Sequence, residues 1–324
     1  MCRGCETACP SGVHFGALME QTRTVLASAQ PRRARFLRLA LKPLGSHRLL
    51  LLGSSLLGIA QRGRLLPQRV VDRLGLPARI PIRRAPLRAD DGVVDAWLFT
   101  GCVMDAWQRD VHAAALRVMR STGSTVGLPQ RGGDCCGALH AHAGLSEPAK
   151  SLAARVIGAF PGNAPIVVDS AGCGAALKDY GHVLGTAEAA EFSARVRDIG
   201  EWLAACVEKL PPARRRFPEP VAIQDACHLR HVQRAHLPMR SVLSKFADTV
   251  ELDDDGRCCG AGGSYQLTQP DLAKEIRAQK IATIQRTGAR MVSSGNPGCS
   301  MWLEAAGVAV LHPVQIIDRA ISGA

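Results

Sequence analysis

Two stretches decide the fold: VVDAWLFTGC at residues 93–102 and VAIQDAC at residues 221–227, because each is a short apolar strand that ends at a cysteine. A second strand of this kind follows each of them, PIVVDSAGC at 165–173 and ARMVSSGNPGC at 289–299. The tripeptide Cys-Cys-Gly lies between the two strands in both places, at 135–137 and at 258–260. The same pattern of strands and cysteines therefore occurs twice.

The spacing of the pattern predicts the fold class. The second copy follows the first at offsets of 125 residues for the first cysteine, 123 for the pair and 126 for the last. Amphipathic stretches, AKSLAARVIGAF at 149–160 and LAKEIRAQKIATIQ at 272–285, separate the strands. Short apolar strands that alternate with helices indicate a parallel α/β unit. We therefore expect an α/β protein of two pseudo-symmetric parallel repeats, at 93–212 and 213–324.

The position of the cysteines predicts metal binding. In an open parallel sheet, ligands bind beyond the carboxyl ends of the strands, where loops enter helices. Four thiolates should converge there in each repeat, and such a soft set favours iron-sulfur clusters or zinc. Eight buried apolar cysteines in matching registers is the weaker alternative. The predicted ligands are Cys102, Cys135, Cys136, Cys173, Cys227, Cys258, Cys259 and Cys299.

The amino terminus carries a third cysteine motif. Cys2, Cys5 and Cys9, followed by Pro10, match the last three cysteines of the bacterial ferredoxin run C-x2-C-x2-C-x3-C-P. The first cysteine of that run would fall two positions before Met1. We expect residues 1–26 to be a partial ferredoxin-like 4Fe-4S motif in a truncated chain. We expect no stable cluster from it unless upstream residues or a partner complete the set.

Histidines and carboxylates near the cysteines are secondary candidates. His228 directly follows Cys227 and is a candidate second-sphere or alternative ligand, the other interpretation being an ordinary polar neighbour. His140 and His142 follow the first Cys-Cys-Gly and are weaker candidates. Carboxylates at strand ends, Asp169 and Asp225, are expected to accept hydrogen bonds from loop amides. The sequence shows no nucleophile-base-acid combination typical of a hydrolase.

The positive charge belongs to one segment. Residues 31–90 hold fourteen lysine and arginine residues against two aspartates, and this difference equals the whole-chain net charge of +12. Leucine-rich stretches broken by Pro43, Gly45, Pro67 and Pro77 predict two or three amphipathic helices in a segment that spans 27–92. Their apolar faces would pack on the following domain, a partner subunit or an anionic membrane surface. Nucleic acid is not expected, because residues 31–90 contain no tyrosine or tryptophan for base stacking.

Targeting signals are not evident in the sequence. The longest uncharged apolar stretch, from Leu49 to Ala60, has about 12 residues, against roughly 20 that are needed to cross a bilayer. The amino terminus carries cysteines in place of the apolar region of a secretory signal. Cysteines in a reducing compartment are metal ligands more often than disulfides. We therefore expect a cytoplasmic protein, with peripheral contact at the inner face of the membrane as an option.

Three long motifs resemble one known family. CETACPSGV at 5–13, SAGCGAALKDYGH at 170–182 and CCGAGGSYQLTQPDLA at 258–273 are similar to the iron-sulfur subunits of glycolate oxidase. These belong to the wider family of cysteine-rich CCG-domain proteins, with the cysteine-rich subunit of heterodisulfide reductase and the lactate-utilisation iron-sulfur proteins. Some members end each cysteine set in Cys-x-x-Cys, but Ala176 and Trp302 occupy those positions here. Each set therefore has four cysteines, and the five-cysteine arrangement tied to disulfide reduction is not matched.

The resemblance implies a subunit of an oxidoreductase complex that relays electrons through 4Fe-4S clusters, with zinc in one cysteine set as the alternative. A flavoprotein dehydrogenase partner would oxidise a 2-hydroxy acid such as glycolate or lactate, and this chain would pass electrons to a quinone or another acceptor. No GxGxxG opens a strand-to-helix unit, so flavin binding is not expected in this chain. The alternative is a disulfide reductase subunit of the heterodisulfide reductase type.

Overall fold

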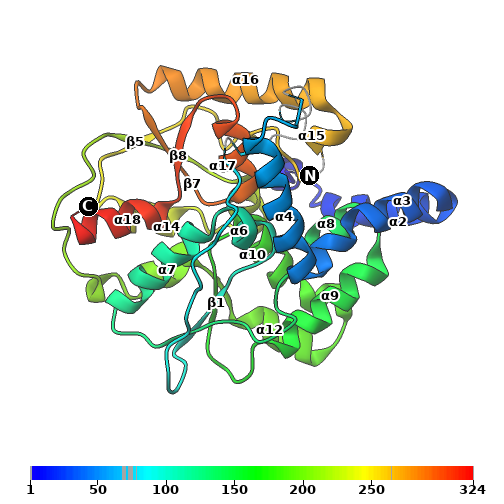
Figure 1. The fold of residues 1–324 in the computed structure, drawn as a ribbon, viewed down its shortest axis with the longest axis horizontal. Coiled ribbons are helices and arrows are strands. Elements are labelled where there is room, and N and C mark those ends of the chain that lie inside the picture. The colour runs from blue at the N-terminus through cyan, green and yellow to red at the C-terminus, as the bar shows by residue number, and fades with distance from the viewer. Residues whose placement is uncertain (1, 68–70, 72–75, 78, 264, 324) are drawn as a thin grey trace.

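The structure is a computed structural model and describes residues 2–67, 71, 76, 77, 79–263 and 265–323. Among these residues, the strands form two four-stranded sheets in which all neighbours are parallel (Figure 1). The first sheet has the order β2-β1-β3-β4, with strands β1 (Ala96–Phe99), β2 (Val126–Gly127), β3 (Ile166–Val168) and β4 (Val196–Asp198). The second has the order β6-β5-β7-β8, with strands β5 (Val221–Gln224), β6 (Thr249–Glu251), β7 (Met291–Ser294) and β8 (Ala309–Leu311).

The two sheets have the same strand order, which confirms the predicted duplication of a parallel α/β unit. The helices of the first repeat are α6 (Val103–Trp107), α7 (Arg109–Ser121), α8 (Ala138–His142), α9 (Ser146–Gly158), α10 (Ala171–Lys178), α11 (Tyr180–Leu184), α12 (Ala187–Arg195), α13 (Ile199–Ala205) and η2 (Val207–Lys209). Those of the second are the π-helical turn η3 (His228–Val232), α14 (Leu237–Leu243), α15 (Tyr265–Thr268), α16 (Pro270–Arg286), α17 (Pro297–Glu304) and α18 (Pro313–Ser322).

Four strands per sheet exceed the two per repeat that the cysteine pattern indicates. The additional strands, β2, β4, β6 and β8, have two or three residues each. Two or three residues are too few to show the alternation by which a strand is found in a sequence. The central strands β1 and β3 are fully buried and form continuous apolar runs, as parallel strands covered on both faces do.

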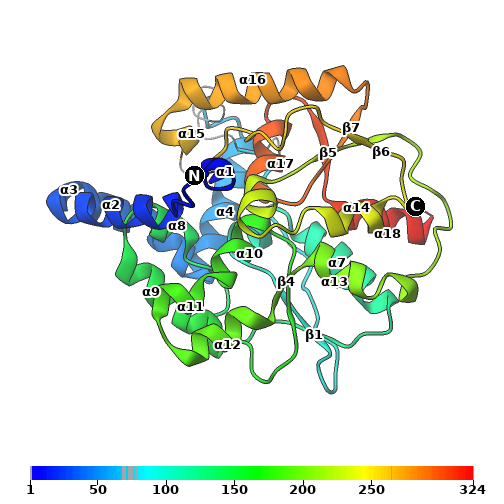
Figure 2. The ribbon, with the colours of Figure 1, turned by 180° about the vertical axis from the view of Figure 1, so that it is seen from behind.

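The repeats share one core through exchanged helices. Helix α7 of the first repeat packs on α18 of the second, and α13 of the first packs on α14 of the second (Figures 1 and 2). Since α7 and α14 occupy equivalent places, as do α13 and α18, the two contacts are related by the pseudo-symmetry of the repeats. A single hydrophobic cluster runs through all four helices, and Val118, Leu203, Val242 and Ile317 belong to it.

Most of the amino-terminal segment lies against the first repeat, and its first helix lies on η3 of the second. It forms α1 (Gly4–Ala8), α2 (Phe15–Ala29), α3 (Pro31–Leu41), the short turn η1 (Lys42–Gly45) and α4 (His47–Arg62). The predicted breaks at Pro43 and Gly45 coincide with η1, so two amphipathic helices are confirmed. The third, expected near 65–75, falls largely outside the described residues. Helices α2 and α3 extend away from the two sheets (Figure 1).

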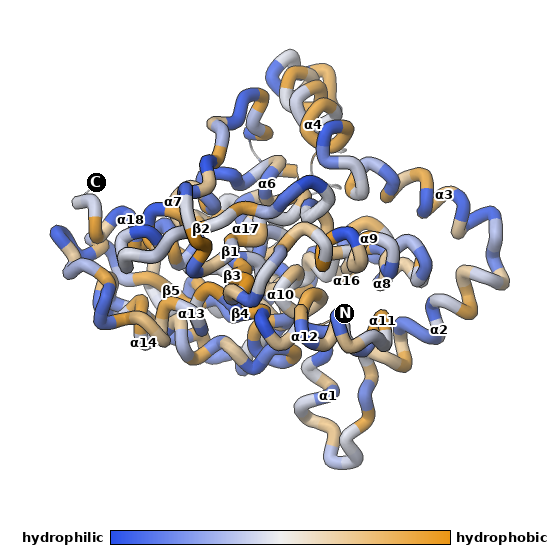
Figure 3. The backbone as a smooth tube through the Cα atoms, turned by 90° about the horizontal axis from the view of Figure 1, so that it is seen from below, coloured by the Kyte–Doolittle hydropathy of each residue, from blue (hydrophilic) through white to orange (hydrophobic). Residues whose placement is uncertain are grey.

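Helix α4 has an unusual distribution of side chains. Its inner face carries Ser54 and Gly58, which are buried against α6 and the chain near Ile80. Its outer face carries leucine and isoleucine side chains that are more than half exposed, namely Leu49, Leu52, Leu56 and Ile59. Figure 3 shows α4 standing out at one edge of the molecule. Within the described residues, no helix has the length and apolar character that crossing a membrane requires.

Candidate metal centre

The sheets bring the predicted cysteines to the carboxyl ends of their central strands, as the sequence predicted. Cys102 and Cys227 directly precede α6 and η3, soon after β1 and β5 end. Cys173 and Cys299 lie in the first turns of α10 and α17, after β3 and β7. The helix amino termini supply free N–H groups and a positive dipole end, which stabilise thiolates.

In the first set, the four sulfurs form two pairs. Cys136 Sγ lies 3.4 Å from Cys173 Sγ, and Cys102 is hydrogen-bonded to Cys135. Cys102, Cys135 and Cys136 are buried and Cys173 is half-buried. Sequence-distant segments thus place all four thiols of the set, Cys102, Cys135, Cys136 and Cys173, in one buried region.

In the second set, made of Cys227, Cys258, Cys259 and Cys299, the pairing is the same. Cys259 Sγ lies 3.0 Å from Cys299 Sγ, and Cys227 is hydrogen-bonded to Cys258. The pseudo-symmetry of the repeats therefore extends from the strands to individual sulfur atoms.

One thiol is readily deprotonated in each of the pairs Cys102–Cys135 and Cys227–Cys258. The hydrogen bond from Cys102, with smaller contributions from His140 and the Gly137 N–H, lowers the pKa of Cys135 to about 5 against the opposing effect of burial. In the second set the hydrogen bonds from Cys227 and Cys259 hold the pKa of Cys258 well below its usual range. The partner thiols Cys102 and Cys227 have a raised pKa because they are the donors. Metal binding at either set would displace the remaining protons.

The chemistry of the donors fits a thiolate-bound metal group. Two sulfurs that each lie about 2.3 Å from one tetrahedral zinc ion are roughly 3.8 Å apart. The sulfurs of Cys136 and Cys173 are closer than this, at 3.4 Å, as are those of Cys259 and Cys299, at 3.0 Å. Among the described residues, no three cysteine, histidine or carboxylate groups stand ready around a single ion. Four thiols in each set fit either a cubane iron-sulfur cluster or a zinc ion. To bind either of them, the sulfurs of each set must move apart.

Glycine in Cys-Cys-Gly is required by close packing. Gly137 and Gly260 have φ values of +76° and +90°, in the left-handed region that favours glycine. A Cβ at Gly137 would lie 3.0 Å from the carbonyl oxygen of Ala149 on α9, and one at Gly260 would overlap the carbonyl oxygen of Ala273 on α16. The first cysteine-bearing loop therefore lies directly on α9, and the second lies directly on α16.

The candidate histidines surround the cysteines unequally. His228 Nδ1 lies 3.7 Å from Cys227 Sγ, within reach of a weak hydrogen bond. His140 is buried and bonded to Cys135. The ligand role of His228 stays a prediction, and its position beside Cys227 agrees with a second-sphere role.

His142 and His228 meet between the two repeats, a contact that the sequence did not reveal. Their ring centroids are 5.9 Å apart with planes inclined by 30°. Burial lowers the pKa of His142 to about 3 and that of His228 to about 4, so both rings are neutral at pH 7. A cavity of about 60 Å³ beside them is also lined by Cys136, Arg3 and Asp179. This cavity therefore connects the neighbourhoods of the first and second sets.

The amino-terminal cysteines belong to neither set, but Cys2 lies near enough to the second set to contribute to the raised pKa of Cys227. Cys2 and Cys5 are exposed and Cys9 is half-buried. Helix α1 rests on η3, where Thr7 Oγ1 lies 3.2 Å from His231 Nδ1 (Figure 2). The ferredoxin-like motif is thus held beside Cys227, the residue that precedes η3, and its ligand role stays a prediction.

The expectation for the two strand-end carboxylates is wrong. Asp225 accepts hydrogen bonds from the guanidinium groups of Arg230 and Arg240, at 3.0–3.1 Å. Asp169 forms a fully buried pair with His112, at 2.7 Å. Buried carboxylates need a charged or strongly donating partner, and these partners come from elsewhere in the chain.

Comparison with known proteins identifies the repeats. The family model described as cysteine-rich domain (CCG) matches residues 96–178 and 221–304. The chain is 29% identical to the glycolate oxidase iron-sulfur subunit of Escherichia coli over 99% of its length and 80% of that protein. It is 28% identical to a probable glycolate oxidase iron-sulfur subunit of Bacillus subtilis over 94% of its length and 75% of that protein.

More distant relatives share the cysteine-rich repeats. Lactate utilization protein A of Oceanobacillus iheyensis is 26% identical over 68% of this chain and 95% of that protein. A crystal structure of a hypothetical protein from Helicobacter pylori has a similar fold, with a TM-score of 0.50 and 10% identity over 89% of this chain and 67% of that one. Because the family model covers more than half of the chain, in both repeats and around all eight paired cysteines, the protein belongs to the cysteine-rich CCG-domain family.

Proposed function

We propose that this chain is the iron-sulfur subunit of a flavin-dependent 2-hydroxy-acid dehydrogenase complex. In this role it passes electrons from a flavoprotein partner to a quinone or another acceptor at the cytoplasmic face of the membrane. The observation that carries the proposal is the pair of equivalent four-cysteine sets at the carboxyl ends of two equivalent sheets. Similarity to the glycolate oxidase subunits of Escherichia coli and Bacillus subtilis supports the substrate class.

The residues of the chain define where such clusters would be held. The first and second sets would each bind one 4Fe-4S cluster through four thiolates, and a bound cluster supplies one-electron transfer. The two Cys-Cys-Gly loops and the helices beneath them bury most of the sulfurs, which excludes water from the metal. Cys2, Cys5 and Cys9 would contribute to a further cluster only with ligands from outside this motif.

Metal analysis of protein purified without oxygen tests this proposal. Iron and acid-labile sulfide in equal amounts, together with restored glycolate-dependent dye reduction in a complex that lacks its own iron-sulfur subunit, are the expected results. The substitutions Cys136→Ser and Cys259→Ser should each remove half of the iron that the wild type holds in the two sets. Stoichiometric zinc without sulfide would refute electron transfer and favour a structural zinc protein.

A second candidate is the reduction of a disulfide substrate at the cysteine sets. It is favoured by the cavity that is lined by Cys136 of the first set and by His228, because a disulfide that reached this cavity would contact Cys136 and lie one residue away from Cys227 of the second set. The isolated chain would then reduce a heterodisulfide with an artificial electron donor. Turnover of that kind, without any restoration of glycolate oxidation, would decide for this alternative.

We also propose that α3 and α4 bind an anionic membrane surface. The exposed leucine face of α4 is flanked by Arg48 and Arg62, and α3 adds exposed Phe36 and Leu39 among four arginines. A basic helix with an exposed apolar face is typical of interfacial membrane binding. Sedimentation with phosphatidylglycerol vesicles, but not with phosphatidylcholine vesicles, is the expected result.

A matched pair of variants separates this surface from general stickiness. The double substitution Leu52→Ser/Leu56→Ser should abolish the binding, whereas Leu237→Ser should keep it, because Leu237 is exposed on α14 of the second repeat. Vesicle binding that is unchanged in the double variant would refute the proposal. Binding of the same face to a purified flavoprotein partner, in place of vesicles, would assign the surface to subunit contact.

A further inference from the structure

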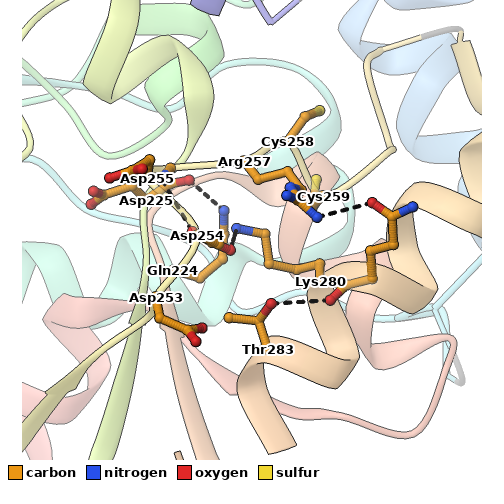
Figure 4. A network of polar contacts seen from close by, with 12 residues as sticks. Gln224, Asp225, Asp253, Asp254, Asp255, Arg257, Cys258, Cys259, Lys280 and Thr283 are labelled. Atoms are coloured by element: carbon orange, nitrogen blue, oxygen red, sulfur yellow. Dashed lines mark hydrogen bonds and ion pairs between the residues drawn. The ribbon is translucent and has the colours of Figure 1, made fainter. Parts of the chain in front are cut away.

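A fully buried lysine lies behind the second cysteine set. Lys280 of α16 has no solvent exposure, and its ammonium pairs with the carboxylate of Asp254, whose side chain is 4% exposed (Figure 4). Lysine is almost never fully buried unless it is paired. Asp254 stands four residues before Cys258, on the loop that carries Cys258 and Cys259.

The pair is the buried member of a group of contacts that fastens this loop to one helix. Asp253 pairs with Arg286 at 2.7 Å, and Arg257 donates to Gln279 at 3.0 Å. Lys280, Gln279 and Arg286 all belong to α16, as does Ala273, on which Gly260 rests. The two ligand cysteines therefore lie between two points of attachment, Asp254 before them and Gly260 after them.

The first repeat has no charge at the equivalent position. Gly137 rests on Ala149 as Gly260 rests on Ala273. When the repeats are aligned on these contacts, Val156 is the residue equivalent to Lys280. Val156 is also fully buried and belongs to a hydrophobic cluster of the first repeat. The chain before Cys135 is attached to the end of α9 by a main-chain hydrogen bond, in which Gln130 N donates to Ala159 O at 3.0 Å.

Stability alone does not account for the lysine. The first repeat shows that an apolar residue fills this position in the same fold. Taking two charges out of water is costly, and replacing a buried ion pair by apolar residues of similar size is often neutral or stabilising. The pair at the second set must therefore be explained by what it does to the loop and its cysteines.

We propose that Lys280 and Asp254 are positioning residues that fix the Cys258–Cys259 loop on α16 and so give the second metal group an environment unlike that of the first. This rests on the proposed function, because it assigns a metal group to each set. It adds that the two sets are not interchangeable. Ligand geometry at the second depends on a charged attachment to α16, whereas the first loop meets the equivalent helix, α9, through apolar and main-chain contacts. Second-sphere contacts of this kind tune a metal site.

Two substitutions distinguish positioning from mere stability. Lys280→Met leaves the carboxylate of Asp254 buried without a counter-charge, with only the hydrogen bond from Gly256 N, so we expect a lower unfolding temperature and loss of the metal bound at the second set. Lys280→Met combined with Asp254→Leu removes both charges and should restore the unfolding temperature. If the pair positions the loop, the double variant will still lack the wild-type paramagnetic resonance signal and midpoint potential of the second set.

The control is Arg286→Met, which removes the pair with Asp253 from the same loop and helix. Both of these side chains are more than half exposed, so the pair adds little to holding the loop, and metal content and spectra should stay as in the wild type. Cys259→Ser identifies which signal belongs to the second set. A double variant with wild-type metal content, spectrum and potential would overturn the inference. If the wild type holds zinc in place of iron, the proposed electron transfer fails, but loss of half the metal from the double variant still supports the positioning role, and full metal content refutes it.

Discussion

Gln108 and Gln233 occupy equivalent places in the two repeats, and the side-chain amide of each reaches across to the other repeat. Gln108 Nε2 donates to Ser300 Oγ of α17 at 2.8 Å, and Gln233 Nε2 donates to the carbonyl oxygen of Ala171 in α10 at 2.9 Å. Both acceptors lie in the helices that carry the last cysteine of a set. Each of these hydrogen bonds therefore links the contact between the repeats to a helix that carries a cysteine of one set.

Removing either amide should destabilise the contact between the repeats. Gln108→Met and Gln233→Met preserve the length of the side chain and delete one hydrogen bond each, so each should lower the free energy of unfolding by about 1 kcal/mol. Urea unfolding followed by circular dichroism measures this. Gln285→Met, on the exposed face of α16, is the control and should be neutral. Two neutral variants at the contact would show that these bonds contribute nothing.

Gly260→Ala should damage the second set. The new Cβ would overlap the carbonyl oxygen of Ala273 at a φ of +90°, so the loop must shift, and we expect a loss of about 1–3 kcal/mol together with the metal of that set. Gly288→Ala is the matched control, since Gly288 also has a positive φ, of +71°, but nothing lies near its Cβ. Equal losses in the two variants would mean that backbone strain, and not the overlap, is responsible.

Tyr180→Phe should affect the first set alone. The Tyr180 hydroxyl is buried and donates to the carbonyl oxygen of Cys136 at 2.9 Å, which holds the first Cys-Cys-Gly loop. Losing this bond should cost about 1–3 kcal/mol, because the buried carbonyl is left without its donor. Metal bound at the second set serves as the internal reference in the same sample. A change that is equal at both sets would contradict a local effect.

Acid should destabilise the protein through His312. Burial lowers the pKa of His312 to about 4, and its two nitrogens are already used: Nδ1 accepts from Val314 N, which caps α18, and Nε2 donates to Asp169 O. Between pH 6.5 and about 4 the unfolded chain binds more protons than the folded one at this residue. Stability is therefore full above pH 6.5 and falls as the pH drops through this range, by up to about 3 kcal/mol.

The test compares the wild type with His312→Asn in urea at pH 7.5 and pH 5. Asparagine retains a side-chain acceptor for the cap and does not titrate. At pH 7.5 the variant should therefore have a lower free energy of unfolding than the wild type. At pH 5 this difference should be smaller, because only the wild type loses stability through His312. A difference that stays constant with pH would exclude His312 as a source of the acid sensitivity.

Much of this site was predictable because its signal is local in sequence. A cysteine that directly follows a parallel strand lies at the carboxyl-end edge of the sheet. The positions of Cys102, Cys173, Cys227 and Cys299 could therefore be predicted from the pattern alone. The repetition of Cys-Cys-Gly added the loops. The edge strands escaped prediction because their pairing partners, and not their own residues, make them strands.

The contacts between distant residues could not be predicted. Lys280 lies on the buried stripe of α16, where a helical pattern would place an apolar residue, and its partner Asp254 is one of three consecutive aspartates, a run that is typical of a solvated loop. His142 and His228 come from different repeats, and nothing in the spacing of either indicates that their rings meet. Asp225 is paired with Arg230 and Arg240, and this pairing depends on how η3 and α14 pack beside the end of β5.

The exchanged contacts of α7 with α18 and of α13 with α14 have a consequence for the two halves of the chain. They form an isologous interface, the kind by which two identical subunits make a closed dimer. Two separate copies of one repeat would form the same contact as a homodimer with two identical cysteine sets. Because the two halves are joined in one chain, each can differ from the other without breaking this symmetric contact, and Lys280 and Val156 are such a difference.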